Sequence, residues 1–517
     1  MRAARTWLAV AGAALAAAPA AAAGLAERGD AGATQWPGNA AVVTYASERA
    51  FRAALAADPA EVVRHVPSLR VAELRPRGGA ARYAAALARR PGILRVEPRR
   101  DRRAAVEPAL VPPSVGGPLQ WQYAATRVDQ VPDDVRRAAA AVTIAVIDTG
   151  ADTTAPDLAA KAPRTYDVRT GTARVVDSNG HGTFVASLAA GSSDNGEGIA
   201  GAGGDARLMI VKAGRADGTF TDVDEAAAIV WAVDHGARIL NLSLGGPETS
   251  AVERNAVEYA VSRGALLVAA VGNDYAEGNA LQYPAALLQR PGSFGAGGDG
   301  LAVTASTRSG ERAAFANTGS HLSLAAPGDG VFAAVSSTSS ARRYPRVPLP
   351  GSLAGSYGFG SGTSYAAPQA SGVAALVWAA NPLLTAAEVA DILERTASGR
   401  GRWTPETGFG VVDAAAAVAA ARNAVPPDAV RVAGTRAGRR VTLSWTRVRD
   451  AAAFRVSVVR DGRRAQVLTP ATASTRATYA LPLGSTYRFT VAALDPNGSP
   501  TAESPPWTVT LRPAPKR

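Results

Sequence analysis

Three segments of the chain carry a carboxylate, an imidazole and a hydroxyl, in that order. Asp148 ends an apolar run, His181 lies between two glycines, and Ser364 begins an alanine-rich stretch. A serine hydroxyl is a poor nucleophile near neutral pH, so it needs a base within hydrogen-bond reach and a third group that holds this base in the right tautomer. We therefore predict a catalytic triad for acyl transfer, with Ser364 as nucleophile, His181 as base and Asp148 as orienting acid.

The glycines around these residues favour the same interpretation. Gly180 and Gly182 let the backbone approach closely around His181, and Gly362 allows a sharp turn before Ser364 enters a helix. A satisfied core histidine is the plain alternative for His181 taken alone. Because the chain has only 4 histidines, and this one lies in a turn of glycines, the catalytic interpretation is favoured.

Between residues 142 and 420, short apolar runs alternate with helical patterns over 222–235 and 249–262. This alternation predicts an α/β fold with a doubly wound, mostly parallel sheet. Asp148 and Asn273 follow the carboxyl ends of their strands, where such sheets place their sites. The apolar runs, which suit strands covered on both faces, are 142–147, 208–211, 239–244, 266–271 and 301–305.

Five motifs around the predicted triad resemble those of a known family. They are Ile147-Asp148-Thr149-Gly150, Gly180-His181-Gly182-Thr183, Asn241-Leu242-Ser243-Leu244-Gly245-Gly246, Val271-Gly272-Asn273 and Gly362-Thr363-Ser364-Tyr365-Ala366-Ala367-Pro368. On these motifs, residues 118–422 resemble the subtilisin family of serine endopeptidases, which uses the same order of acid, base and nucleophile. The resemblance implies an endopeptidase that hydrolyses protein or peptide substrates through an acyl-enzyme.

The resemblance also implies roles for residues of the substrate site. Asn273 matches the asparagine that donates to the developing oxyanion, although Gly272-Asn273-Asp274 would also suit a plain turn. Glycine on both walls of the cleft leaves an open pocket, so we expect a broad preference for apolar or aromatic side chains before the cleaved bond. The residues that match these walls, where an extended peptide adds as a further strand, are Ser243, Leu244, Gly245 and Gly218.

The chain departs from the commonest pattern of this family in three places. Phe184 and Gln369 stand where histidines are often found, but neither position belongs to the triad. The segment 336–359 is longer than the family's loop before the nucleophile. We expect it to shape or cover one side of the cleft, and the sequence leaves open which side.

A structural calcium ion is a further implication of the resemblance. Asp157 follows Asp148 by nine residues, and the loop 191–199 contains Asp194; both match the family's high-affinity site, in which Gln120 also takes part. Carboxylate, amide and carbonyl oxygens suit Ca²⁺ better than a transition metal. A solvated acidic turn is the alternative.

The N-terminus predicts export. Residues 1–23 are typical of a signal peptide, because Arg2 and Arg5 precede an apolar run and Ala21-Ala22-Ala23 offers a small-residue cleavage site. We therefore expect a secreted, extracellular protein.

Residues 24–115 predict a small α+β unit, with strands and helices alternating between residues 41 and 97. The resemblance implies that this unit is a propeptide, which assists folding and then inhibits the active site. We expect residues 99–103 to form an exposed basic linker, followed by a protease-sensitive Pro112-Pro113.

The catalytic domain is expected over residues 116–425 and a different fold over 426–517. In the second range, apolar and polar residues alternate and turns occur at Asp461-Gly462 and Asn497-Gly498, which predicts an antiparallel β-sandwich. Trp445 and Tyr487 make it resemble a fibronectin type III module.

The composition of the chain excludes several kinds of chemistry and argues against one class of partner. The chain lacks cysteine, which excludes disulfides, a thiolate nucleophile and cysteine-ligated metals. Basic and acidic residues number 17 and 9 in 1–115, 23 and 29 in 116–425, and 15 and 5 in 426–517. This asymmetry argues against nucleic acid as a partner of the whole chain. No later run of about 20 apolar residues follows the signal, so we expect no membrane contact after signal cleavage. We also expect a monomer.

Two other hypotheses stay open. One is a catalytically limited scaffold whose C-terminal domain binds a specific partner, and the other is a membrane-tethered processing protease with one dedicated substrate. The intact triad and Asn273 count against the first, and the lack of a C-terminal apolar span counts against the second.

Overall fold

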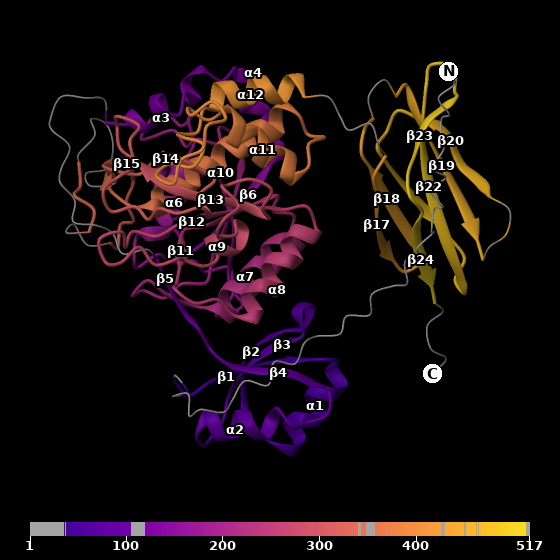
Figure 1. Cartoon of the computed structure of the whole chain (residues 1–517), viewed down its shortest axis with the longest axis horizontal. Coiled ribbons are helices and arrows are strands. Elements are labelled where there is room, and N and C mark those ends of the chain that lie inside the picture. The colour runs from indigo at the N-terminus through magenta and orange to yellow at the C-terminus, as the bar shows by residue number, and fades with distance from the viewer. Residues whose placement is uncertain are drawn as a thin grey trace, which may run out of the picture.

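The computed structural model describes residues 36, 38–104, 119–339, 343–347, 357–424, 430–448, 451–461, 463 and 465–512. In chain order they form a small α+β unit, a large α/β domain and a β-sandwich (Figure 1). The predicted signal peptide, Pro112-Pro113 and the expected boundaries at 115/116 and 425/426 lie outside the described residues.

The N-terminal unit is an antiparallel sheet packed against two helices. Its elements are β1 (Ala41–Tyr45), α1 (Glu48–Ala57), β2 (Glu61–Val66), η1 (Pro67–Leu69), β3 (Val71–Arg75), α2 (Ala80–Leu87) and β4 (Ile93–Pro98). The strand order is β2-β3-β1-β4, and Tyr45, Phe51 and Leu74 lie in the core. The expected α+β unit is confirmed. Strand β2 was not predicted, because most of its residues are exposed or half-buried and show no clear apolar alternation.

A parallel sheet of seven strands forms the centre of the large domain. In order across the sheet, the strands are β14 (Leu324–Pro327), β13 (Gly300–Ser306), β12 (Leu266–Ala270), β10 (Ile239–Leu242), β6 (Thr143–Asp148), β8 (Arg207–Lys212) and β7 (Arg164–Asp167). All neighbouring pairs are parallel. The five predicted strands all belong to this sheet.

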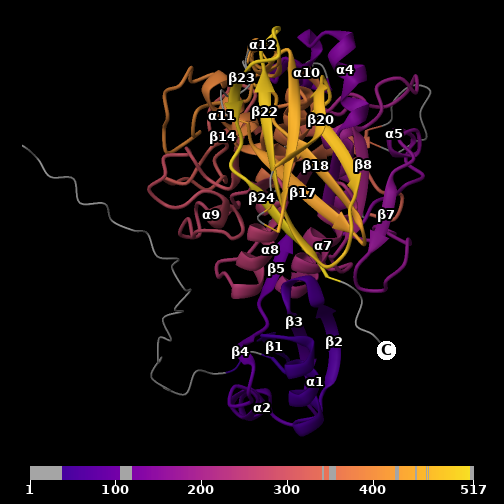
Figure 2. The same cartoon turned by 90° about the vertical axis from the view of Figure 1, so that its right-hand side faces the viewer.

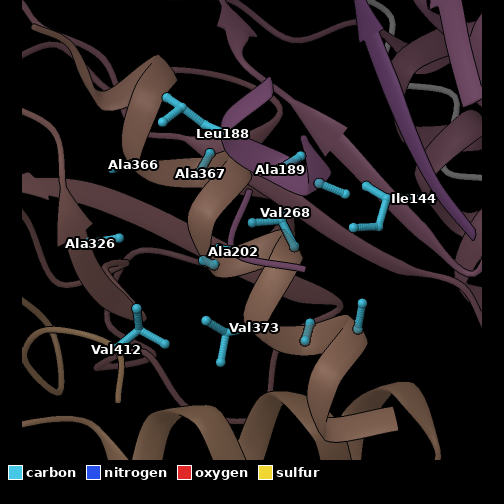
Figure 3. Packing of buried hydrophobic residues seen from close by; sticks show 14 of the residues in the cluster. Ile144, Leu188, Ala189, Ala202, Val268, Ala326, Ala366, Ala367, Val373 and Val412 are labelled. Atoms are coloured by element: carbon cyan, nitrogen blue, oxygen red, sulfur yellow. The ribbon is translucent and has the colours of Figure 1, made fainter. Parts of the chain in front are cut away.

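Helices cover both faces of the sheet, as a doubly wound fold requires. They include α6 (His181–Ala190), α10 (Thr363–Ala380), α7 (Asp222–Asp234) and α8 (Ala251–Ser262). Ile144 and Val268 pack on the face covered by α6 and α10 (Figure 3). Ala145 and Leu267 belong to the cluster on the α7 and α8 side. Because successive strand residues point to opposite faces, both faces are apolar and the strands read as continuous apolar runs.

The remaining elements of the domain are shorter or lie at its edge. They are α3 (Trp121–Ala125), η2 (Val128–Gln130), α4 (Asp133–Ala138), η3 (Ala139–Ala141), α5 (Pro156–Ala159), β9 (Thr219–Thr221), β11 (Leu244–Gly245), α9 (Ala285–Leu288), β15 (Val331–Ala334), β16 (Tyr357–Gly360), α11 (Ala386–Thr396) and α12 (Ala414–Asn423). None of the helices in the described parts of the chain is both long and apolar enough to cross a membrane.

The segment expected to be an exposed basic linker is instead a strand inside the large domain. Strand β5 (Asp101–Ala104) is the middle strand of a three-stranded sheet, between β11 and β9. Arg102 is only 1% exposed. The prediction for 99–103 was wrong because buried carboxylates from distant parts of the chain surround this arginine, and local charge does not reveal them.

The C-terminal unit is the predicted β-sandwich. One sheet contains β17 (Val432–Ala437), β18 (Arg440–Trp445) and β21 (Arg476–Ala480); the other contains β20 (Gln466–Thr472), β19 (Ala453–Arg460), β22 (Ser485–Leu494), β23 (Pro500–Glu503) and β24 (Trp507–Leu511). Figure 2 shows the long strands of this unit. Trp445, Phe454 and Phe489 belong to a core of its own, separate from the core of the α/β domain.

Candidate active site

The predicted acid and base meet where β6 ends and α6 begins. Nδ1 of His181 lies 2.8 Å and 3.0 Å from the two carboxylate oxygens of Asp148, and both side chains are fully buried. The backbone N–H of Thr149 also donates to Oδ1 of Asp148, at 2.6 Å. A carboxylate accepts hydrogen bonds, so Nδ1 is the protonated nitrogen and Nε2 is the one that can accept a proton.

Glycines let these two elements approach each other. A Cβ on Gly182 would lie 2.1 Å from the carbonyl oxygen of Gly150, and Gly150 itself has φ +113°. An L side chain rarely adopts that φ, and a Cβ cannot fit at that distance. Gly150 and Gly182 therefore set the close contact that brings Asp148 and His181 together.

Asp177 supports the same junction and was not predicted from the sequence. Its Oδ1 accepts hydrogen bonds from the Thr149 hydroxyl and the Gly180 N–H, both at 2.8 Å. Its Oδ2 accepts from the N–H and the hydroxyl of Thr183, at 2.8 Å and 2.6 Å. The side chain is 1% exposed and links the segment after β6 to the first turn of α6. The available signal was a carboxylate four residues before the histidine, because short acidic side chains often satisfy the N–H groups at a helix start.

Ser364 lies in the first turn of α10, fully buried beside the same junction. Its hydroxyl donates to the carbonyl oxygen of Ser243 at 3.2 Å, and the Ser243 hydroxyl donates to the carbonyl of Ser364 at 2.7 Å. The ring of Tyr365 lies 5.7 Å from the His181 ring, centroid to centroid. The structure thus brings the nucleophile segment against the base.

Asn273 follows β12 and is held by the residue before Ser364. Its Oδ1 accepts hydrogen bonds from the N–H and the hydroxyl of Thr363, both at 2.9 Å. These two bonds fix the orientation of the amide, and Nδ2 lies 3.3 Å from the place where a Cβ on Gly362 would stand. The N–H₂ group therefore lies beside the turn that precedes Ser364, where a donor to an oxyanion is needed.

The residues expected to bind substrate surround strand β5. Ala104 is the register partner of Leu244, and Arg103 is that of Gly245. On the other side, the N–H of Ala104 donates to the carbonyl of Gly218 at 2.9 Å. A cavity of about 400 Å³ opens beside this strand, lined by Leu244, Gly245 and Gly272 among others. An extended peptide is thus already seated in the predicted cleft, as an added strand.

The two residues that stand where histidines are often found are both buried. Phe184 stacks on Tyr344 at 5.0 Å between ring centroids and packs against Tyr365 at 4.4 Å. Nε2 of Gln369 donates to the carbonyls of Pro327 and Tyr365, at 2.5 Å and 2.8 Å.

The described part of the long loop packs next to the base. A Cβ on Gly180 would meet the side chains of Ser339, at 2.5 Å, and Tyr344, at 3.0 Å. The hydroxyl of Tyr365 donates to that of Tyr344 at 3.2 Å. Residues 343–347 therefore buttress the turn that carries His181.

The residues expected to bind calcium lie around α5. Oδ1 of Asp157 accepts from Nδ2 of Asn195 at 2.9 Å, and Oδ2 accepts from the N–H of Ile199 at 3.2 Å. The side-chain amide of Gln120 donates to the carbonyl of Ala200 and accepts from its N–H. Ala200 directly follows Ile199, which contacts Asp157. Asp194 is exposed in the same loop.

Asp157 is fully buried, and within the described residues no lysine or arginine forms an ion pair with it. Burial raises the pKa of Asp157 to about 6. A buried carboxylate without a compensating cation fits a hard divalent cation such as Ca²⁺. Among the described residues, the two carboxylate oxygens of Asp157 accept from N–H groups of Asn195 and Ile199, and no cluster of three or more acidic or histidine side chains could hold a metal.

Comparisons with known proteins all point to the same family. The model of the subtilase family matches residues 139–411. The thermophilic serine proteinase of Bacillus sp. (strain AK1) is 35% identical over 245 residues, which cover 47% of this chain and 54% of that protein. The M-protease of Shouchella clausii (strain KSM-K16) is 36% identical over 276 residues, covering 53% of this chain and 64% of that protein. The chain therefore matches about half to two thirds of the length of these relatives.

A solved structure extends the likeness in fold to most of the chain. The crystal structure of fervidolysin from Fervidobacterium pennivorans, described as a keratinolytic enzyme related to subtilisin, superposes with a TM-score of 0.64. The match covers 91% of this chain and 76% of that chain, at 23% identity. At this identity, the likeness establishes the fold alone.

Proposed function

The chain belongs to the subtilase family, and we propose that it is a serine endopeptidase that acts through Ser364, His181 and Asp148. The observation that carries the proposal is the buried hydrogen bond of 2.8 Å between His181 Nδ1 and Asp148, with the segment of Ser364 packed against the imidazole. This arrangement leaves Nε2 as the base for a serine hydroxyl. An intact triad speaks against the catalytically limited scaffold.

Each residue of the site has a defined step. Ser364 Oγ attacks the carbonyl carbon of the scissile bond while Nε2 of His181 takes its proton, and Asp148 stabilises the imidazolium. Nδ2 of Asn273 donates to the oxyanion that forms. The C–N bond then breaks, and His181 gives its proton to the leaving amine. A water molecule, deprotonated by His181, hydrolyses the acyl-enzyme and restores the Ser364 hydroxyl.

Ser364→Ala in the full chain tests this proposal. We expect the variant to fold, to hydrolyse a denatured protein at least about 10⁴-fold more slowly, and to remain an uncleaved precursor, because the same site performs maturation. Ser309→Ala, in an exposed turn, is the matched control and should behave as wild type. Normal processing and activity of the Ser364 variant would contradict the assignment.

We propose further that the protein is secreted as a zymogen, with residues 24–115 as inhibitor. Strand β5 occupies the cleft, and the N-terminal unit contacts the helices beside it (Figure 1). Arg64 forms an ion pair of 2.8 Å with Asp224 in α7, and Glu97 accepts a hydrogen bond of 3.0 Å from the N–H of Ala251 at the start of α8. Such contacts hold a peptide in the site until the chain is cut.

We propose that the C-terminal β-sandwich is a fibronectin type III-like accessory domain. The hydroxyl of Tyr487 donates to the carbonyl of Pro482 at 2.9 Å. A tyrosine bonded to the backbone a few residues upstream is a corner feature of immunoglobulin-like sandwiches. We propose a binding or spacer role for this unit, without a part in the chemistry.

Calcium bound at Asp157, with Gln120 and the loop of Asp194, is the proposed structural ion. It would supply the positive charge that the buried carboxylate lacks. Because an ion that binds only the folded state stabilises it by mass action, excess calcium should raise the melting temperature of the wild type, and a chelator should lower it. Asp157→Asn should abolish the calcium effect, whereas Asp234→Asn, an exposed acid in α7, should keep it. An unchanged melting temperature after verified metal removal would contradict the site.

A further inference from the structure

The side chain of Arg102 fills a buried pocket of three carboxylates. Asp222, Glu225 and Glu253, which we call the acidic pocket, are all fully buried. Nε of Arg102 donates to Oε1 of Glu253 at 3.0 Å, and Nη2 lies 2.9 Å from Oε2. Nε also lies 3.6 Å from Oε2 of Glu225. The pocket is formed by the first turns of α7 and α8, and it receives a guanidinium group that belongs to the strand in the cleft.

The pocket holds more carboxyl groups than one arginine can pair with. Burial raises the pKa of Glu225 well above its usual value and that of Asp222 to about 7. Among the described residues, neither oxygen of the Glu225 carboxylate has a hydrogen-bond partner, and neither does Oδ2 of Asp222. When β5 leaves the cleft, three buried carboxyl groups remain beside it with unused acceptor oxygens. Such a pocket favours a cation with several donors.

The register of β5 relates this pocket to the catalytic serine. Ala104 lies opposite Leu244 in an antiparallel pair, so the next residue of a peptide bound in this register lies opposite Ser243. The carbonyl of Ser243 accepts the hydroxyl hydrogen bond of Ser364, so that residue is the one presented to the nucleophile. A side chain in the acidic pocket belongs to the residue three positions before it.

Alternation along the strand separates the contacts that select from those that do not. Arg102 and Ala104 are buried, whereas Asp101 and Arg103 are exposed. Successive side chains of a strand point to opposite sides, so a substrate would present every second residue to the protein. The position of Arg102 is therefore a selective contact of the cleft, and that of Arg103 is open to many side chains.

We propose that the acidic pocket gives the protease a preference for peptides with arginine three residues before the residue whose carbonyl Ser364 attacks. This inference rests on the proposed endopeptidase function and names its substrate class. Arginine suits the pocket better than lysine, because Nε and Nη2 of its planar guanidinium approach the two carboxyl oxygens of Glu253. In this structure Nη1 also donates to the Asp101 carbonyl, at 3.2 Å. Recognition of the chain's own β5 and of substrates then uses the same contact.

A peptide series on the matured wild-type enzyme tests the preference without any variant. Four fluorogenic peptides should differ only at this position, with arginine, lysine, leucine or citrulline, which has the shape of arginine without its charge. Mass spectrometry of the products confirms that the same bond is cut. We expect kcat/KM for the arginine peptide to exceed that of the leucine and citrulline peptides by about 10- to 100-fold, because buried charged hydrogen bonds discriminate to this extent. Equal or faster cleavage of the leucine or citrulline peptide would overturn the proposal.

A variant pair locates the effect. Glu253→Gln should lower the ratio of kcat/KM for the arginine peptide to that for the leucine peptide about 10-fold or more. Glu258→Gln, an exposed acid on the same helix, should leave this ratio unchanged. If the Glu253 variant does not mature, the wild-type series still decides. Failure to cleave any of the peptides would contradict the endopeptidase function itself, whereas cleavage without the arginine preference would contradict only this inference.

Discussion

Asp177 tests whether the catalytic histidine depends on residues that never meet the substrate. Its four hydrogen bonds hold the segment after β6 against the first turn of α6. In Asp177→Asn, the amide nitrogen would face groups that also donate, so at least one buried bond is lost. We expect kcat to fall about 10-fold with KM nearly unchanged, because substrate binding is untouched while the base is misplaced. Steady-state kinetics on a short peptide measures this split.

Asp167→Asn is the matched control for this prediction. Asp167 is buried to a similar degree and lies at the end of the edge strand β7, where its Oδ1 accepts a hydrogen bond from the Arg169 N–H at 2.8 Å. It should lower the melting temperature without changing kcat. An equal loss of kcat in both variants would show that Asp177 acts only through stability.

The sequence was sufficient to predict the site residues that lie in short local motifs. Asp148, His181 and Ser364 each lie in such a motif, and the structure brings their segments together. Arg102 could not be predicted in the same way. Its partners Glu225 and Glu253 lie more than 100 residues away in the chain and belong to no recognisable motif. The run of arginines was therefore interpreted as a solvated linker.

At the scale of elements, prediction succeeded for the five inner strands of the parallel sheet and missed its two edge strands, β14 and β7. The five apolar runs became strands of the parallel sheet, because strands covered on both faces must be apolar at every position. Only Asp167 of the four residues of β7 is buried, so this strand shows no apolar run. Strand β14 is fully buried but only four residues long. Strand β9 is three residues long, and β11 two, which is too short for a periodic pattern.

Helix α11 contains a buried acid that should make stability fall as pH rises. Burial raises the pKa of Glu394 from 4.5 to about 8. Between these values, the folded state binds more protons than the unfolded state, so the free energy of unfolding decreases with rising pH. Glu394→Gln should therefore raise the melting temperature by several degrees at pH 8 and by little at pH 5, measured by calorimetry on the active-site serine variant to prevent autolysis.

An exposed acid provides the comparison for this pH dependence. Glu406→Gln lies in a surface turn that follows α11 and should give a difference from the parent that does not vary with pH. If the Glu394 variant were equally displaced at pH 5 and pH 8, the carboxyl would not be titrating with a raised pKa.

Charge divides the whole molecule into units that match its folded parts. Residues 1–115 carry an excess of basic groups and residues 116–425 an excess of acidic ones. Arg64 pairs with Asp224, Arg100 with Glu248 and Arg102 with Glu253 across these two units. The basic groups of the N-terminal unit therefore pair with acidic groups of the α/β domain. The sequence alone did not indicate this pairing.

The β-sandwich should be dispensable for peptide hydrolysis. Its buried residues form a hydrophobic core of their own, between Val430 and Leu511, and among the described residues this core shares no member with that of the α/β domain. A chain that ends after Val425 should keep kcat/KM on a short chromogenic peptide within about twofold. With 15 basic against 5 acidic residues, the removed unit should contribute to binding of an insoluble anionic substrate. This contribution should shrink with added salt, because exposed charges are screened beyond about 10 Å at 0.1 M. Loss of peptide hydrolysis by a folded truncated chain would place the sandwich within the catalytic architecture.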